Sequence, residues 1–142
     1  MARPATLAIV DGAGTQNVAL TATGVVPTPS LGTGVYSFGT VTGVKTNTFT
    51  LSNTGTSAAP YVIGSITVAK TGTGPGAYSV FGGTCAANQT LAVGRTCTVI
   101  VQFVPSTNNT TKGITSATLT VTGTGVGVAT TYTATRGMTG TF

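Results

Sequence analysis

Threonine and apolar residues alternate along several stretches of this chain. The alternation is clearest at Thr48–Leu51, Thr98–Phe103, Thr118–Thr122 and Thr131–Thr135. Side chains along a β-strand point to opposite faces in turn, so a period of two with β-branched residues indicates strands with one buried face. Glycine-rich turns separate these stretches, and no ten-residue segment carries a helical stripe free of Gly or Pro. The pattern therefore predicts an all-β chain.

The alternation and the turns together predict an antiparallel β-sandwich. We expect strands at residues 5–10, 16–23, 34–41, 46–53, 61–69, 77–81, 95–104, 115–122 and 129–135. The apolar residues expected in the core are Val35, Phe38, Val41, Phe49, Leu51, Ile63, Ile66, Val68, Phe81, Leu91, Val99, Val101, Phe103, Leu119 and Val121.

The charged residues limit the chemistry of these 142 residues. The sequence has no histidine, and Asp11 is its one acid. A catalytic triad and a pair of carboxylates for acid–base work are thereby excluded, and no metal site or cofactor is expected. The six Lys and Arg residues stand singly, which predicts no nucleic-acid site. No apolar run approaches the roughly 18 residues of a membrane helix, so no membrane insertion is expected.

The two cysteines, Cys85 and Cys97, bracket a loop-like stretch. A disulfide between them would close a loop of about a dozen residues and stabilise the fold by about 3 kcal/mol. Two buried free thiols are the alternative. A disulfide would place the protein outside a reducing cytosol.

The start of the chain resembles its end. Ala5-Thr6-Leu7 recurs as Ala117-Thr118-Leu119, and Thr21-Ala22-Thr23 recurs as Thr133-Ala134-Thr135. This similarity predicts a hairpin at residues 1–24, either the tail of an upstream repeat or an exchange arm, then a linker at 25–33 and the sandwich at 34–142. Chance similarity in a Thr-rich sequence is one alternative, and a hairpin that packs back on its own sandwich is another. The candidate self-association residues of the hairpin are Leu7, Ile9, Val18 and Leu20.

Two stretches support a family resemblance. The first is Ser37–Val41 with Phe49–Gly55, and the second is Cys85 with Leu91–Pro105. In these stretches the chain resembles the bacterial choice-of-anchor-D repeats, which are Ig-like modules related to the ASH and MSP domains. In that family a Cys pair precedes a strand that ends in Phe-x-Pro. The polar turn Ser106–Lys112 is longer than the family's, and Tyr61 stands where Leu is more usual. The resemblance implies tandem, non-catalytic repeats of large bacterial surface or secreted proteins.

These observations predict a non-catalytic structural module of an extracellular or cell-surface protein or filament, and no enzyme. Its expected partners are copies of itself or neighbouring repeats, joined head to tail by β-strand complementation. The alternatives are a carbohydrate- or host-binding adhesion module, which would need an aromatic platform, and a virion decoration protein. The candidates for that platform are Tyr36, Tyr61, Tyr78 and Tyr132, although tyrosines on strands more often pack half-buried.

Overall fold

The structure is a computed structural model, and it describes residues 2–55, 59–106 and 113–141. Within them the strands are β1 (Ala2–Asp11), β2 (Gly14–Thr23), β3 (Pro29–Ser30), β4 (Val35–Thr40), β5 (Lys45–Asn53), β6 (Tyr61–Lys70), β7 (Ala77–Gly83), β8 (Thr90–Leu91), β9 (Thr96–Val104), β10 (Ile114–Gly125) and β11 (Thr131–Thr141). Most of the polar turn expected at Ser106–Lys112 lies outside the described residues. No helix long and apolar enough to span a membrane occurs in the described part of the chain.

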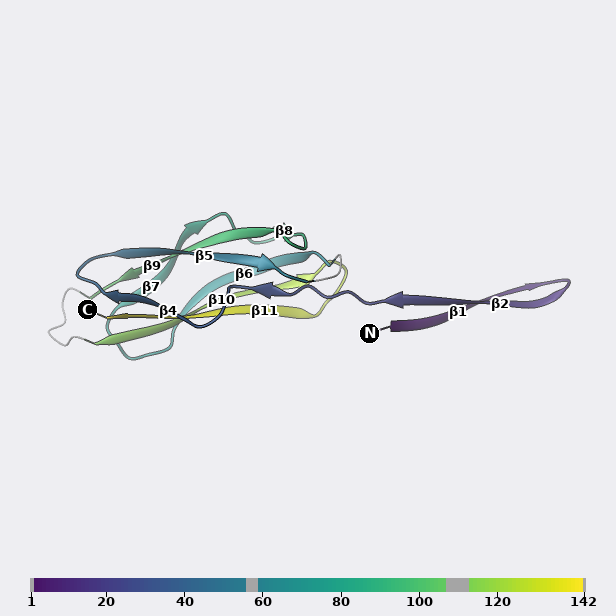
Figure 1. Ribbon diagram of the computed structural model, residues 1–142, viewed down its shortest axis with the longest axis horizontal. Coiled ribbons are helices and arrows are strands. Elements are labelled where there is room, and N and C mark those ends of the chain that lie inside the picture. Colours follow the sequence, from purple (N-terminus) through teal and green to yellow (C-terminus); the bar gives the residue numbers. More distant parts are fainter. Residues whose placement is uncertain (1, 56–58, 107–112, 142) are drawn as a thin grey trace.

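Two sheets face each other and form a sandwich, while the hairpin β1–β2 extends from one end of it (Figure 1). One sheet has the strand order β4-β11-β10-β6-β8, and the other has the order β3-β5-β9-β7. The expected all-β sandwich with an N-terminal hairpin is confirmed. It is not wholly antiparallel, because β4 pairs with β11 in parallel, with Val35 opposite Gly137.

The core lies between the two sheets and follows the predicted alternation. In β9 the inward residues are Cys97, Val99, Val101 and Phe103, and each is at most 3% exposed. The expected core residues are buried except for four. Ile66 and Val68 are partly buried against the core, while Val35 and Phe81 are exposed.

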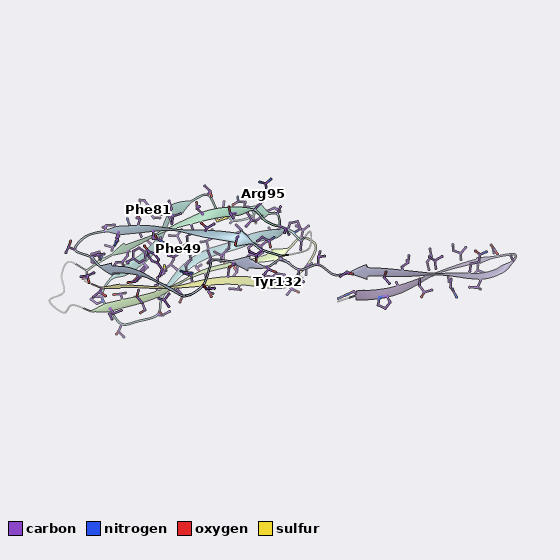
Figure 2. The ribbon with its side chains drawn as sticks, viewed as in Figure 1. Phe49, Phe81, Arg95 and Tyr132 are labelled. Atoms are coloured by element: carbon purple, nitrogen blue, oxygen red, sulfur yellow. A yellow bond between two sulfur atoms is a disulfide. The ribbon has the colours of Figure 1, made fainter. Side chains whose placement is uncertain are left out.

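The prediction was wrong for Val35 and Phe81, which are 66% and 63% exposed. Val35 begins β4, an edge strand of its sheet. Phe81 lies on β7, the edge strand of the other sheet, where the pairing with β9 shifts between Val80 and Gly82. Such a shift puts the bulge residue out of the alternation, and Phe81 points outward (Figure 2).

The tyrosines form no exposed aromatic platform, because all four pack on the core. Tyr61 is completely buried, and its hydroxyl donates to the carbonyl of Tyr132 at 3.2 Å. The hydroxyl of Tyr78 donates to the carbonyl of Thr115 at 2.9 Å. Burial raises the pKa of Tyr61 and of Tyr78 to about 12, since the charged form loses hydration inside the protein. The aromatic rings therefore serve the core.

The predicted disulfide between Cys85 and Cys97 is confirmed, with Cα atoms 5.0 Å apart. It joins the loop after β7 to the start of β9, and Cys97 is buried. Backbone N–H groups of Thr84 and Cys85 also donate to the carbonyl of Thr98. The bridge therefore holds an edge strand of the four-stranded sheet to its neighbour.

Candidate functional site

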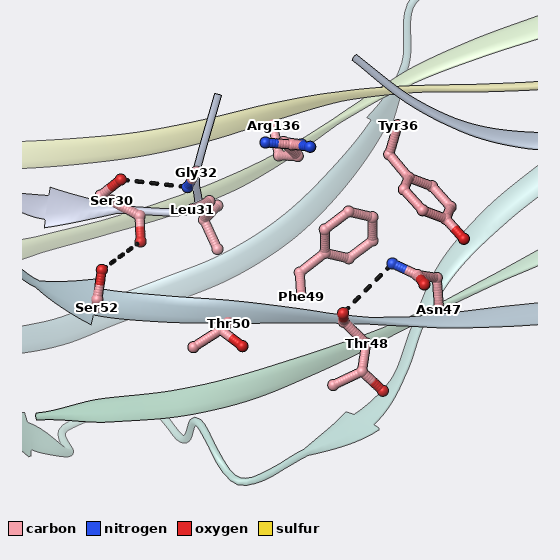
Figure 3. Close-up of a pocket in the computed structure, with 10 residues that line it drawn as sticks. All are labelled: Ser30, Leu31, Gly32, Tyr36, Asn47, Thr48, Phe49, Thr50, Ser52 and Arg136. Carbon is pink, nitrogen blue, oxygen red and sulfur yellow. Dashed lines mark hydrogen bonds between the residues drawn. The ribbon is translucent and has the colours of Figure 1, made fainter. Parts of the chain in front are cut away.

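A hollow of about 470 Å³ opens on the side of the sandwich where the chain crosses from one sheet to the other. It lies between β3, an edge of the four-stranded sheet, and β4, an edge of the five-stranded sheet. Its lining residues come from β3, β4, β5, β11 and the loop between β3 and β4: Ser30, Leu31, Gly32, Tyr36, Asn47, Thr48, Phe49, Thr50, Ser52 and Arg136 (Figure 3).

Arg136 is the charged residue of this hollow. It lies on β11 between Ala134 and Met138, whose side chains are in the core, so the strand alternation directs Arg136 inward as well. Its Nε atom is buried and has no hydrogen-bond partner. A buried N–H group without a partner is costly, while the Arg136 side chain as a whole is partly exposed.

No acidic side chain of the described residues lies beside this guanidinium. The one acidic side chain of the sequence, Asp11, lies in the turn of the distant hairpin, where it accepts the backbone N–H of Ala13 at 2.8 Å. Arg136 therefore presents an unneutralised positive charge to the hollow. Electrostatically, the hollow favours an anion.

Gly32 lets the loop between β3 and β4 approach the guanidinium. A Cβ atom at this position would lie 2.9 Å from Nη1 of Arg136. Gly32 also has a φ of +80°, which L side chains rarely adopt. The Ser30 hydroxyl accepts the Gly32 N–H at 3.2 Å and holds the loop in place. The positive φ therefore favours glycine here, whereas the guanidinium, at the end of a flexible side chain, could move away from an added Cβ.

Aromatic rings form the floor and one side of the hollow. Tyr36 and Phe49 meet edge to face, with ring centroids 5.4 Å apart. In Figure 3, Phe49 lies beneath Arg136 and Tyr36 lies to one side. Hydroxyl and amide groups of Ser30, Asn47 and Ser52 line the rim, and the Asn47 amide donates to the Thr48 carbonyl. A cation above apolar walls suits a carboxylate that is carried on an organic group.

The hollow was not predicted from the sequence, although Tyr36, which lines it, was one of the candidates for an aromatic platform. The signal for it was present, because Arg136 occupies an inward position of a strand in a chain with a single acid. The strand predicted at 129–135 ended one residue too early to reveal it. The other predicted residues lie elsewhere: Cys85 and Cys97 are in the disulfide, and Leu7, Ile9, Val18 and Leu20 are on the hairpin.

Comparison with protein families and with curated proteins gives no match for this chain. Two solved structures resemble it. The VesB protease of Vibrio cholerae matches at 20% identity with a TM-score of 0.53, over 82% of this chain and 32% of its own. The secreted serine protease VesC of Vibrio cholerae matches at 18% identity with a TM-score of 0.46, over 73% of this chain and 21% of its own. At these identities the likeness is one of fold.

This chain spans about a third of the length of VesB. The match contradicts the expectation of a non-catalytic structural module, with its adhesion and virion alternatives, and the expectation that the chain is no enzyme. The error was to infer the functional class of the protein from the amino-acid composition of these 142 residues. The absence of histidine concerns these 142 residues, and their fold matches about a third of the VesB chain. The choice-of-anchor-D resemblance and the domain boundaries stay predictions.

Proposed function

We propose that this chain is a β-sandwich part of a protease, and that its Arg136 hollow binds a carboxylate of the polypeptide on which the protease acts. The observation that carries the proposal is Arg136, a cationic side chain that lines an open hollow with no acidic side chain of the described residues beside it. The fold shared with part of VesB supports the association with a protease.

The surroundings of the hollow fit an extended polypeptide. Edge strands carry backbone N–H and C=O groups that can pair with an added strand. Both β3 and β4 are edge strands that border the hollow, but β3 is only Pro29–Ser30 and proline has no backbone N–H, so β4 is the edge available for pairing. A polypeptide lying along β4 would bring its side chains over Arg136, Tyr36 and Phe49. The guanidinium would select a carboxylate, and the rings would contact the aliphatic part of the same residue.

The disulfide supports a location outside the reducing cytosol. Disulfides persist in oxidising compartments and are rare in the cytosol. We therefore place the proposed protease outside the cell or at its surface, where the Cys85–Cys97 bridge is stable.

Peptide binding tests the role of Arg136. The probes are a blocked pentapeptide with one aspartate among alanines, its asparagine counterpart, and an alanine peptide with a free carboxyl end, each titrated into the full chain by NMR. We expect the aspartate peptide to bind about tenfold more tightly than the asparagine peptide, since a hydrogen bond to a charged group contributes about 1.5–3 kcal/mol. Arg136→Gln should abolish this preference. The free-carboxyl peptide shows whether a chain end is accepted as well as a side chain.

Arg95→Gln is the matched control, because Arg95 is an exposed arginine on the loop before β9 (Figure 2). It removes the same charge and should keep the preference for aspartate. Equal binding of the aspartate and asparagine peptides by the unmodified chain would contradict the proposed site. An equal loss in both variants would reduce the effect to net charge.

Immunodepletion tests the association with a protease. An antiserum against the 142-residue chain is used to deplete the extracellular fraction of its source, and hydrolysis of fluorescent casein is measured before and after depletion. We expect the antiserum to remove a casein-hydrolysing activity, and pre-immune serum to leave that activity in solution. A preparation that contains the chain but loses no activity would show that the chain does not belong to a protease.

A further inference from the structure

The hairpin β1–β2 is a two-stranded sheet on its own. Its strands pair with each other from Ala2 opposite Thr23 to Asp11 opposite Gly14, and no other described strand joins either edge. Isolated two-stranded hairpins are marginally stable in water, and three or more strands or a packed face are normally needed. The hairpin therefore has the geometry of an incomplete unit.

One face of this hairpin is apolar. Leu7 lies opposite Val18, and Ile9 and Leu20 are on the same face two positions away on their strands. These four side chains are between 47% and 50% exposed, and they alternate along their strands with small or polar residues such as Thr6, Ala8 and Ala19. Nothing in the described chain covers this face.

The strand pairing shows which part of the sandwich the hairpin resembles. Ala5-Thr6-Leu7 of β1 matches Ala117-Thr118-Leu119 of β10. Ala5 pairs with Leu20 in the hairpin, and Ala117 pairs with Met138 in the sandwich. The pairing therefore makes β2 equivalent to β11.

This equivalence corrects the repeat seen in the sequence. The counterpart of Leu20–Thr23 is Met138–Thr141, which reads Met-Thr-Gly-Thr against Leu-Thr-Ala-Thr. It is not the stretch Thr133–Thr135. The shift arises because β10 and β11 are joined by a longer connection than the turn between β1 and β2.

In the sandwich, the equivalent face is covered. Ala117, Leu119, Val121 and Met138 are each at most 2% exposed, because the four-stranded sheet packs on them. Ala5, Leu7, Ile9 and Leu20 occupy the same places in the hairpin. In the sandwich, a face of this composition therefore packs against the inner face of a second sheet.

We infer that β1 and β2 are the last hairpin of a second β-sandwich of the same kind. Its strands equivalent to β3, β5, β9 and β7 cover the Leu7–Leu20 face, and its strands equivalent to β4 and β6 pair with the two edges of the hairpin. A second complete copy of this chain does not offer that place, because its own β10 and β11 fill it. The covering unit is a sandwich that lacks its own last hairpin. Val18 stands in the place of Arg136, so this second sandwich has no arginine hollow.

A tandem protein tests the inference. A copy of residues 25–112 is joined to the front of the complete 142-residue chain. In this tandem protein the hairpin of residues 2–23 comes directly after the added copy, at the place that β10 and β11 have after residue 112 in the chain itself. Amide hydrogen exchange is then measured by NMR in the tandem protein and in the chain alone. We expect exchange of the β1 and β2 amides to slow by about a hundredfold or more in the tandem protein, because they join a cooperative core.

The control is the same tandem protein with Leu7→Asn and Leu20→Asn, which removes the apolar face and leaves the backbone pairing possible. It should lose the added protection. Unchanged hairpin exchange in the tandem protein would overturn the inference, and so would equal protection in the control. Protection in the chain alone that rises with its concentration would also overturn it, since the cover would then be another complete copy.

Discussion

At the scale of single residues, Asn53 connects three segments that are distant in sequence. Its side chain is completely buried. The amide donates to the carbonyls of Ala59 and Leu91, at 2.9 and 3.1 Å, and the amide oxygen accepts the N–H of Thr28 at 3.0 Å. Buried polar groups of this kind are satisfied only as a set, because the loss of one member leaves the others unpaired inside the protein.

We expect Asn53→Ala to lower the free energy of unfolding by about 3 kcal/mol or more, since each buried group left unpaired costs about 1–3 kcal/mol. Urea denaturation followed by circular dichroism measures the change. Asn53→Asp is the informative companion, because aspartate keeps the acceptor for Thr28 but brings a negative charge to the two carbonyls. It should rescue little or nothing, and a near-normal stability of either variant would show that the network is dispensable.

At the scale of elements, the alternation of the sequence predicted most strands to within a few residues, because most strands of the sandwich have one face in the core. β11 was predicted too short, at 129–135, whereas it runs to Thr141. Gly137 and Gly140 lie in the missed part, and glycine is depleted in strands. The two-residue strands β3 and β8 were also missed, since two residues carry no period.

The ring of Phe103 explains why a glycine stands at position 140 within the strand. A Cβ atom on Gly140 would lie 2.6 Å from Cε1 of that ring, and one on Gly76 would lie 2.5 Å from Cε2. The ring thus fills the space that two side chains would need. Such a fit across two sheets depends on which residues the fold brings together, and local sequence does not contain it.

Gly140→Ala should therefore destabilise the sandwich by about 1–3 kcal/mol, the usual cost of overpacking. Gly43→Ala is the matched control, because a Cβ there meets nothing within 4 Å and the effect should stay within about 0.5 kcal/mol. Both are measured by urea denaturation. If Phe103→Leu in the Gly140→Ala background restores no stability, the clash with the ring is not the cause.

At the scale of the whole molecule, the candidate site is an outcome of topology. Arg136 reaches the hollow because β4 pairs in parallel with the last strand, and the chain crosses between the sheets beside it. Sequence periodicity predicts which face a residue occupies, but it does not predict the order of strands in a sheet. The sequence likewise shows that the two ends of the chain are alike. The strand pairing was needed to align β2 with β11.

The last prediction follows from the separation of the hairpin from the sandwich. β1 and β2 contact each other far more than any strand of the sandwich. The linker is different, since Pro27 is buried and the Thr28 N–H is bound by Asn53. Deletion of residues 1–24 should therefore leave the free energy of unfolding of the sandwich within about 0.5 kcal/mol of its original value, as expected for a change away from the core. Removal of residues 1–28 should cost more, because it leaves the Asn53 amide oxygen unpaired. Urea denaturation of the two truncated chains compares these effects, and a large loss in the shorter deletion would mean that the hairpin supports the sandwich itself.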